Sequence, residues 1–358
     1  MRDSRLAKLR ARMQERKLDA LLVTSIPNIF YLTGFTGSAA AALVTSDNVF
    51  VLVDPRYTVQ ATAECAGCHV VEYANKSATV ALAEQVGELD IATAGYEADD
   101  LTVSAFRRLR AGIPKRVSLR ATRNLIEELR RVKDADEIQL IRKACAIADK
   151  AFEDVIGQIS VGMREKEIAL LVDSTLRRVG ADKEAFETIA ASGPNSACPH
   201  ASPTDRAIEH GDLLKMDFGA RYRGYNSDIT RTVCIGEPTA KQREVYDVVL
   251  EAQARAIDAI APGKTGQEID AAARDFIASK GYGDSFGHGL GHSLGILVHD
   301  GPGFSRTSDV VLEPEMVMTV EPGIYIEGWG GIRIEDDVII TEDGAEVLTH
   351  ATKELISL

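Results

Sequence analysis

Five side chains in the C-terminal half of the sequence are of the types that hold divalent cations: Asp217, Asp228, His292, Glu321 and Glu335. The four acidic residues lie in apolar, strand-like segments, so their carboxylates are expected to be buried. A buried carboxylate is costly unless a cation neutralises it. Four of them, together with a histidine flanked by glycines, predict a metal site.

The apolar segments that carry the carboxylates form two pairs. Leu213–Gly219 and Ser227–Val233 are predicted to be two strands joined by a turn at Arg221–Asn226, and Val317–Gly323 with Ile332–Ile339 is predicted to be a second such pair. Adjacent strands can bring two carboxylates within bridging distance. A single pair could be two surface acids beside a turn, but the apolar neighbours in both pairs indicate burial.

The segment Gly287–Gly295 supplies the imidazole of His292. Its glycines allow the backbone to approach a ligand closely. One nitrogen with four carboxylates forms a hard, oxygen-rich site, which favours Mn²⁺ or Co²⁺, with Zn²⁺ as an alternative. Two such ions about 3.5–4 Å apart can share a bridging hydroxide and polarise a carbonyl group, which is hydrolytic chemistry.

Three short motifs compete with this interpretation. Gly291–Gly295 matches the G-x-S-x-G elbow of serine hydrolases with Ser293 as nucleophile, although that elbow should follow a buried strand and the glycine-rich Gly281–Gly287 precedes it. Cys65–His69 matches the haem-attachment pattern C-x-x-C-H, which requires export. Asp217–Gly219 matches the magnesium-binding motif of kinases, but this sequence has no phosphate-binding loop to accompany it. A serine hydrolase remains one alternative.

Composition limits the class of protein. A chain of 358 residues predicts about two domains. The net charge of −13 argues against nucleic-acid binding. Five cysteines without framework spacing, no signal-like N-terminus and no long apolar run predict a cytoplasmic protein that does not span a membrane.

The order of helix and strand patterns predicts an α/β (α+β) fold with two domains, residues 1–130 and 131–358. The N-terminal part alternates between the two patterns, as a small α/β domain does. Near residue 130 the pattern changes, and Asp134 with Glu137 is typical of a capping box that starts a long helix ending near Ile156. Further helices and strands are expected at Arg5–Lys17, Ala20–Ser25, Ala40–Thr45, Val49–Val53, Tyr57–Glu64, Ile91–Tyr96, Val103–Arg110, Glu165–Val179, Lys241–Ala259 and Gln267–Lys280.

These motifs together resemble the pita-bread (M24) metallopeptidases, which include methionine aminopeptidase, aminopeptidase P and prolidase. The resemblance covers essentially the whole chain. The N-terminal part is similar to the creatinase/prolidase-like domain that aminopeptidase P and prolidase carry. The segments that carry the resemblance are Asn28–Ser38, Val53–Tyr57, Met216–Gly219, Ser227–Thr232, Gly291–His292, Val298–Asp300, Thr319–Tyr325 and Gly331–Asp336.

The resemblance implies a role for each metal-ligand position. Asp217 is expected to bind one ion, while Asp228 and Glu335 bridge the two ions. His292 and Glu321 are expected to complete the coordination. Glu321 is also expected to move a proton from the bridging water to the leaving nitrogen.

The same resemblance implies roles around the metal ligands. His200 is expected to bind substrate, and His299 to support the carbonyl oxygen as it becomes an oxyanion. His288 is expected to line the same pocket. Arg333 is expected to hold the carboxylate of Glu335.

The implied substrate is a peptide with a free N-terminus and proline at the second position, and relatives imply a homodimer or higher homo-oligomer. In some prolidases an arginine lies a few residues after the equivalent of His299. This sequence has Gly303 at that position. Arg306 could take the place of that arginine through a different loop path. We therefore expect an Xaa-Pro aminopeptidase (aminopeptidase P), with Xaa-Pro dipeptidase (prolidase) as the alternative. A noncatalytic peptide-binding protein on the same fold is a further alternative.

Overall fold

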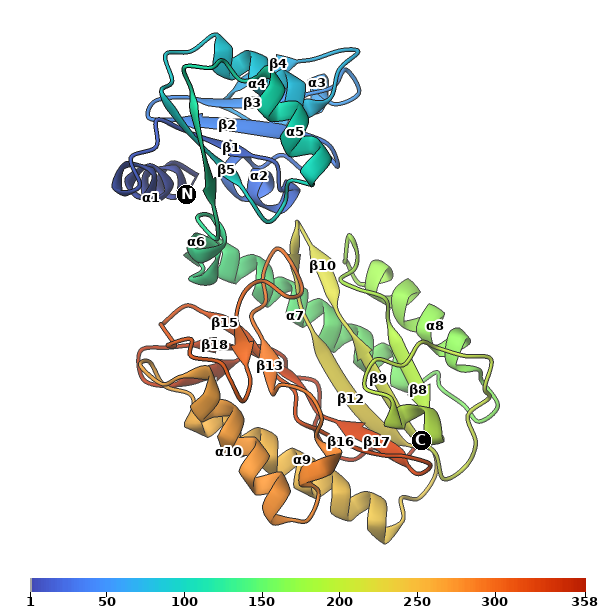
Figure 1. Cartoon of the computed structure of the whole chain (residues 1–358). Helices are drawn as coiled ribbons and strands as arrows, with labels where there is room; N and C mark the ends of the chain where they lie inside the picture. The colour runs from blue at the N-terminus through green and yellow to red at the C-terminus, as the bar shows by residue number, and fades with distance from the viewer. Residues whose placement is uncertain (1) are drawn as a thin grey trace. The chain divides into compact units, whose positions relative to one another are not determined.

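The computed structural model describes residues 2–358 (Figure 1). Contacts within the chain divide it into two compact units, Met1–Arg130 and Arg131–Leu358. Among the described residues, no helix has both the length and the apolar character needed to cross a membrane.

The N-terminal unit is built on a six-stranded mixed sheet with the order β4-β3-β2-β1-β5-β6. β1 pairs antiparallel with β2 and parallel with β5, so the predicted strand at Ala20 and the predicted hairpin after Ala40 are confirmed. The strands are β1 (Ala20–Val23), β2 (Ala41–Thr45), β3 (Val49–Val53), β4 (His69–Glu72), β5 (Thr93–Glu97) and β6 (Ser118–Thr122). The helices are α1 (Arg2–Glu15), α2 (Ile26–Thr33), α3 (Thr58–Glu64), α4 (Ala78–Gly87), α5 (Val103–Gly112) and α6 (Glu127–Arg131).

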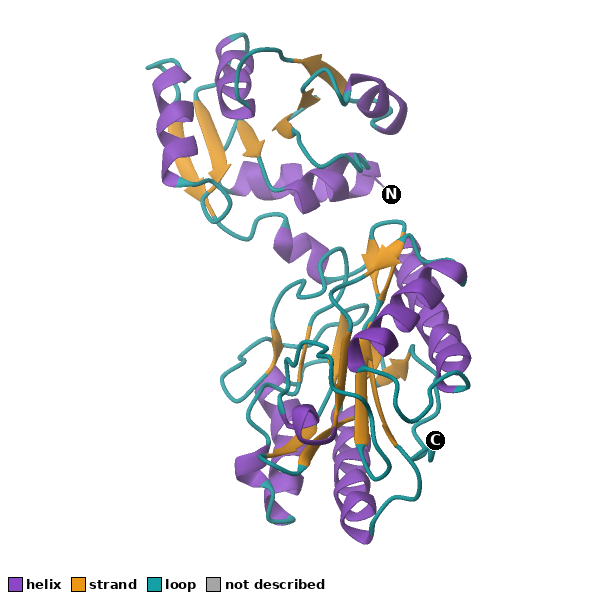
Figure 2. Ribbon diagram, turned by 90° about the vertical axis from the view of Figure 1, so that its right-hand side faces the viewer, coloured by secondary structure: helices purple, strands orange, loops and turns teal. Residues whose placement is uncertain are grey.

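The C-terminal unit places its strands between two pairs of helices, as Figures 1 and 2 show. The helices are α7 (Ala135–Ile156), α8 (Glu165–Arg178), α9 (Ala240–Ala259) and α10 (Gly266–Ser279), with short 3₁₀ turns η1 (Gly193–Ala197) and η2 (Gly283–Ser285). The strands are β7 (Lys183–Glu184), β8 (Ile189–Ser192), β9 (Leu213–Phe218), β10 (Ala220–Tyr222), β11 (Tyr225–Asn226), β12 (Ile229–Cys234), β13 (Gly291–His292), β14 (Gly303–Phe304), β15 (Val317–Val320), β16 (Gly323–Ile326), β17 (Gly330–Arg333), β18 (Asp336–Ile340) and β19 (Ala345–Val347).

Two apolar cores bury the faces of these strands. One packs α7 and α8 against β8, β9 and β12 and includes Phe152, Met216 and Ile229. The other packs α9 and α10 against β15 to β18 and includes Val249 and Ile332. The strands lie between the two cores, which accounts for the apolar neighbours of the acidic residues.

Both predicted strand pairs are present, but each is interrupted near its middle. β9–β12 and β10–β11 share one antiparallel register, and β15–β18 and β16–β17 share another. Extending each register across its interruption places Gly219 opposite Asp228 and Glu321 opposite Glu335. The turn of the first hairpin is tighter than predicted, at Arg223 and Gly224, which both have a positive φ.

The predicted capping box at the start of α7 is confirmed. The side chain of Asp134 accepts hydrogen bonds from the backbone N–H groups of Asp136 and Glu137, and Glu137 accepts one from the backbone of Asp134. Buried residues such as Ile141 and Phe152 recur along one face of this helix. The cap therefore fixes where the helix that supports the first hairpin begins.

We expect Asp134→Ala to lower the free energy of unfolding of the C-terminal unit by about 1 kcal/mol, because it leaves two helix N–H groups unpaired. Asp136→Ala removes a carboxylate from the same turn but no cap, and should cost about 0.5 kcal/mol or less. Denaturant unfolding followed by circular dichroism measures both. Equal destabilisation by the two substitutions would contradict the role of the cap.

Candidate functional site

A cavity of about 360 Å³ in the C-terminal unit gathers eight of the nine side chains that the sequence singled out. These are Asp217, Asp228, His292, Glu321, Glu335, His200, His299 and Arg333. They come from both hairpins, from β13 and from two loops. His288 is the one predicted residue that does not line the cavity.

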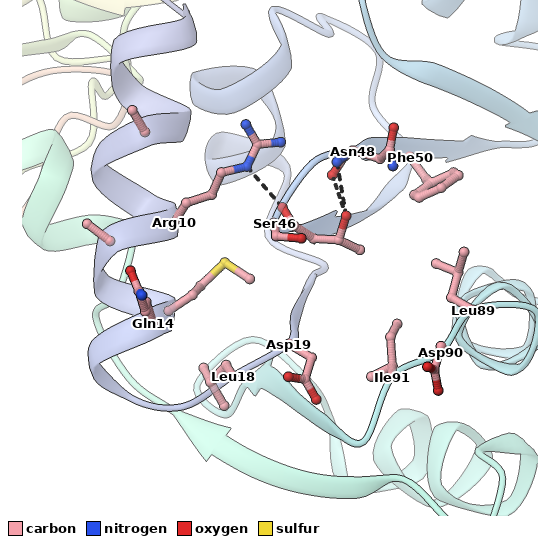
Figure 3. A pocket seen from close by; sticks show the side chains of 14 residues that line it. Arg10, Gln14, Leu18, Asp19, Ser46, Asn48, Phe50, Leu89, Asp90 and Ile91 are labelled. Atoms are coloured by element: carbon pink, nitrogen blue, oxygen red, sulfur yellow. Dashed lines mark hydrogen bonds between the residues drawn. The ribbon is translucent and has the colours of Figure 1, made fainter.

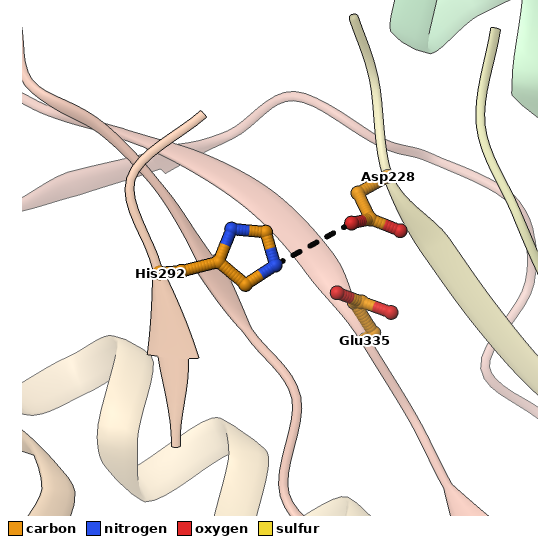
Figure 4. A group of neighbouring side chains, drawn as sticks. All are labelled: Asp228, His292 and Glu335. Carbon is orange, nitrogen blue, oxygen red and sulfur yellow. Dashed lines mark ion pairs between the residues drawn. The ribbon is translucent and has the colours of Figure 1, made fainter. Parts of the chain in front are cut away.

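Three of these side chains form the centre of the cluster. One ligand atom from each of Asp228, His292 and Glu335 lies within 4.8 Å of the others, and Figure 4 shows them converging from separate segments. His292 Nε2 lies 3.5 Å from Asp228 Oδ2 and 3.5 Å from Glu321 Oε1. This arrangement can hold a metal ion.

The interruptions in the two hairpins explain how the acidic residues reach this cluster. The backbone N–H of Glu321 donates to Leu290 O at 2.8 Å, and that of Glu335 donates to Thr230 O at 3.1 Å. The N–H of Asp228 donates to Asp337 Oδ2 at 2.9 Å. Each residue thus bonds to a segment outside its own hairpin. The bonds from Glu335 and Asp228 join the two hairpins at the cavity.

Close backbone packing positions Asp228. A Cβ atom at Gly219, opposite Asp228 in the hairpin, would lie 1.9 Å from the carbonyl oxygen of Ser227. No side chain fits there, so the interruption depends on this glycine.

The protonation state of His292 determines which ring nitrogen can bind a cation. Burial, with a contribution from His299, lowers the pKa of His292 to about 4, so its ring is neutral near pH 7. Nδ1 lies 3.2 Å from the carbonyl oxygen of Ser293, which can only accept a hydrogen bond. Nδ1 therefore carries the proton, and Nε2 presents a lone pair to carboxylate oxygens. Two such acceptors repel each other unless a cation lies between them.

Within the described part of the chain, two carboxylate oxygens at the cavity also lack a hydrogen-bond partner. These are the buried Asp217 Oδ1 and Asp228 Oδ1. Burial, together with the charge of Glu335, raises the pKa of Asp228 well above its usual value. Burial, together with the charge of Glu321, does the same to the pKa of Glu335. Burial also raises the pKa of Glu321 to about 7. Hard divalent cations fit these unpaired oxygens.

Arg333 pairs with a different acidic residue from the one predicted. Its Nη2 donates to Asp217 Oδ2 rather than to Glu335. Its Nε donates to Thr230 Oγ1 at 3.0 Å, and that hydroxyl donates to Glu335 Oε2 at 2.6 Å. The arginine thus reaches Glu335 through a threonine. Sequence reasoning did not single out Thr230, because a threonine in a strand carries no signal of such a role.

The other three histidines that the sequence singled out occupy two environments. His200 and His299 are exposed at the cavity, where each can meet a bound molecule. His288 instead contacts the hydroxyl of Tyr325 at 2.9 Å, and Arg333 Nη1 donates to the same hydroxyl at 2.9 Å. Burial lowers the pKa of His288 to about 4. His288 therefore supports the layer behind the cavity.

The alternative nucleophile is poorly placed. Ser293 is buried, and its Oγ donates to the carbonyl oxygen of Pro302 at 2.5 Å. The residue follows the two-residue strand β13 rather than a long buried strand that leads into a helix. The elbow geometry of serine hydrolases is therefore absent at this serine.

A second cavity, of about 760 Å³, lies in the N-terminal unit (Figure 3). Two of its polar side chains bond to the backbone: Arg10 Nε donates to Thr45 O, and Asp19 Oδ2 accepts from the N–H groups of Ala92 and Thr93. Among the described residues, no group of metal-ligating side chains lines this cavity.

Comparisons with known proteins identify the family. Residues 139–342 match the model of metallopeptidase family M24, and residues 5–132 match the creatinase/prolidase N-terminal domain. The chain belongs to family M24, and the predicted family and fold class are confirmed.

Named relatives match along nearly the whole chain. A Xaa-Pro dipeptidase from Pyrococcus furiosus is 39% identical, covering 98% of this chain and 99% of the relative. The structure of a Xaa-Pro dipeptidase from Bacillus anthracis is 42% identical with a TM-score of 0.96, covering 100% of both chains. The structure of an X-Pro aminopeptidase from Thermotoga maritima MSB8 is 41% identical with a TM-score of 0.90, covering 97% of this chain and 100% of the other.

We expect chelator-treated protein to melt at a lower temperature at pH 8 than at pH 6. Raised pKa values in the folded state mean that protonated carboxyls stabilise the fold at low pH, and this stability is lost as the pH rises through those pKa values. Saturating Mn²⁺ should raise the melting temperature by about 5–10 °C, and by more at pH 8 than at pH 6. A melting temperature that Mn²⁺ leaves unchanged at both pH values would contradict the metal site.

We expect Thr230→Val to weaken Mn²⁺ binding about 10- to 100-fold, because it removes the hydroxyl that orients Glu335. Thr232→Val is a matched control: that buried hydroxyl lies two residues along the same strand and hydrogen-bonds to the carbonyl oxygen and the N–H of Arg333. Isothermal titration calorimetry measures both affinities. Equal losses would show that the hydroxyl of Thr230 has no specific role.

Proposed function

We propose that this chain is a two-metal exopeptidase that hydrolyses the bond between an N-terminal residue and a following proline, with Xaa-Pro dipeptides as its main substrates. The observation that carries the proposal is the single cavity in which unpaired carboxylate oxygens, a neutral imidazole and two exposed histidines converge. Membership of a metallopeptidase family supports the hydrolytic chemistry.

The preference for dipeptides rests on the names of relatives. The sequence alone favoured an aminopeptidase, but the full-length relatives from Pyrococcus furiosus and Bacillus anthracis are Xaa-Pro dipeptidases. We therefore take the dipeptidase as the main proposal.

The aminopeptidase remains a second candidate because of the cations in the cavity. Among the described residues that line it, Arg333 is the sole arginine or lysine, and its Nε, Nη1 and Nη2 all donate to protein groups. A Cβ atom at Gly303 would lie 2.3 Å from the carbonyl oxygen of Gly291, so no arginine fits there. Arg306 is exposed and does not line the cavity. A dipeptide would need another cation to bind its free carboxylate, whereas a longer peptide has no carboxylate at that position.

The proposed ligand set is the one that the sequence suggested. Asp217 would bind one ion, Asp228 and Glu335 would lie between the two ions, and His292 and Glu321 would complete the set. Mn²⁺ is the proposed metal, with Co²⁺ or Zn²⁺ as alternatives, because oxygen ligands dominate. When bound, these ions supply Lewis acidity towards the scissile carbonyl and lower the pKa of water.

The remaining steps belong to protein side chains. Glu321 takes a proton from water and delivers it to the proline nitrogen, which must be protonated to leave as an amine. His299 donates a hydrogen bond to the carbonyl oxygen as negative charge develops there, and His200 binds the substrate. A bond to proline has no N–H, so an enzyme that holds the N-terminus and the carbonyl loses no contact.

Parallel assays of an Xaa-Pro dipeptide and an Xaa-Pro-Xaa tripeptide test this function. The protein is stripped with chelator and resupplied with Mn²⁺, Co²⁺ or Zn²⁺. Metal-restored cleavage of the dipeptide is the expected result, and cleavage restricted to the tripeptide would establish the aminopeptidase instead. No turnover of either peptide with any metal would favour a noncatalytic binding protein. Activity that survives chelation but is lost in Ser293→Ala would favour a serine hydrolase.

We expect Glu321→Gln to lower kcat by about 10²- to 10⁴-fold without lowering the melting temperature of the chelator-treated protein, because the substitution removes the proton carrier but not the shape of the side chain. Glu187→Gln is the control, since it makes the same change to an exposed residue of the same cavity that lies outside the metal cluster. A similar kcat in Glu321→Gln and wild type, both loaded with metal, would refute the assignment.

A further inference from the structure

The segment that carries His200 forms part of the lining of the candidate cavity. His200, Ala201, Ser202 and Pro203 all face it. We call residues 192–204, from the end of β8 to Thr204, the His200 loop. Most of this loop is irregular, with one short 3₁₀ turn, η1, so contacts with neighbouring segments hold it in place.

A single buried carboxylate binds both ends of the His200 loop. Glu165, the first residue of α8, is fully buried. Its Oε1 accepts from the N–H and the Oγ of Ser192 at 2.6 and 2.7 Å. Its Oε2 accepts from the N–H and the Oγ1 of Thr204 at 2.9 and 2.6 Å, and from Asn195 Nδ2 at 2.9 Å. One side chain thus closes a loop of irregular backbone.

A single buried ammonium group binds the middle of the same loop. Lys215 is fully buried, and its Nζ donates to three carbonyl oxygens, those of Ser196, Cys198 and Pro199, at 3.1, 2.7 and 3.3 Å. Its Nζ also lies 5.0 Å from the centre of the Tyr325 ring. Within residues 2–358, no carboxylate forms an ion pair with it.

The cost of burying Lys215 indicates its role. A buried ammonium group without a carboxylate partner is expensive, and a smaller apolar residue would avoid that cost. Three loop carbonyls are what compensates it here. One of them, Pro199 O, immediately precedes His200 and also accepts from Arg333 Nη1 at 3.2 Å. The loop is therefore tied to the layer that supports the metal-ligating carboxylates.

We propose that Glu165 and Lys215 are positioning residues that fix the His200 loop, and so set how tightly the cavity holds its substrate. The proposal rests on the proposed function, because it takes the substrate to be a peptide bound beside His200. Neither residue needs to touch the reacting atoms. Their effect is expected on substrate binding more than on metal binding.

The variant Glu165→Gln tests the proposal, because an amide in place of the carboxylate presents donors to N–H groups that also donate. Glu137→Gln is the matched control: Glu137 is a buried glutamate in the first turn of α7, where it accepts from the Asp134 N–H and the Tyr225 hydroxyl. Hydrogen exchange followed by mass spectrometry should show faster exchange in peptides covering residues 192–204 in Glu165→Gln but not in Glu137→Gln. This measurement needs no activity.

Kinetics and metal titration then separate positioning from a general structural effect. For Glu165→Gln we expect KM for the better of the two proline peptides to rise about tenfold, with Mn²⁺ affinity within about twofold of wild type. Glu137→Gln should change neither. Lys215→Met, which acts from the other side of the loop, should reproduce the faster exchange and the higher KM.

Several results would overturn the proposal. Unchanged exchange in the His200 loop would show that Glu165 does not hold it, and faster exchange with an unchanged KM would show that the loop does not position substrate. A parallel loss of Mn²⁺ affinity would indicate a general collapse of the site. Where Glu165→Gln fails to fold, Thr204→Val offers a milder change at an exposed residue. It removes one of the five hydrogen bonds to Glu165, together with the bond from the Arg206 N–H, and should give smaller changes in the same direction. A wild-type protein inactive on both peptides would refute the proposed function, while the exchange data would still decide whether the loop is held.

Discussion

Repulsion among acidic groups in a buried space is the constraint on which the rest of this structure depends. Asp228 and Glu335 are almost fully buried. Burial and the charge of Glu335 oppose ionisation of Asp228, and burial and the charge of Glu321 oppose ionisation of Glu335. Among the described residues, Arg333 is the sole arginine or lysine that lines the cavity, and it pairs with Asp217. The ligand atoms of Asp228, His292 and Glu335 lie close together, which is the arrangement that a divalent cation stabilises.

The buried cations of the protein lie behind this cluster and hold its backbone. Arg231 donates to the carbonyl oxygen of Glu335 and to the carboxylate of Asp336. Arg333 holds Asp217, and Lys215 holds the His200 loop. Positive charge is thus used to fix the backbone and the back of the cavity, while the front keeps its negative charge. A site that is rigid before its ligand binds loses little order on binding.

Some of this arrangement could be predicted from the sequence, and some could not. Strand periodicity and the acids within apolar segments indicated both hairpins and four of the five candidate ligands, and the glycine-flanked His292 supplied the fifth. The interruptions at Asp228, Glu321 and Glu335 were not predicted, because they depend on hydrogen bonds to segments distant in sequence. The family resemblance implied Glu335 as the partner of Arg333, whereas the structure gives Asp217 from the other hairpin. Glu165 and Lys215 have no sequence signal, since their partners are mostly backbone groups of a loop.

Anomalous diffraction from crystals grown with Mn²⁺ tests the central claim most directly, because it locates the ions without reference to activity. The account predicts two anomalous peaks in the C-terminal cavity, contacted by Asp217, Asp228, His292, Glu321 and Glu335. A cavity without a peak, or a single ion bound elsewhere with these carboxylates left unpaired, would contradict it.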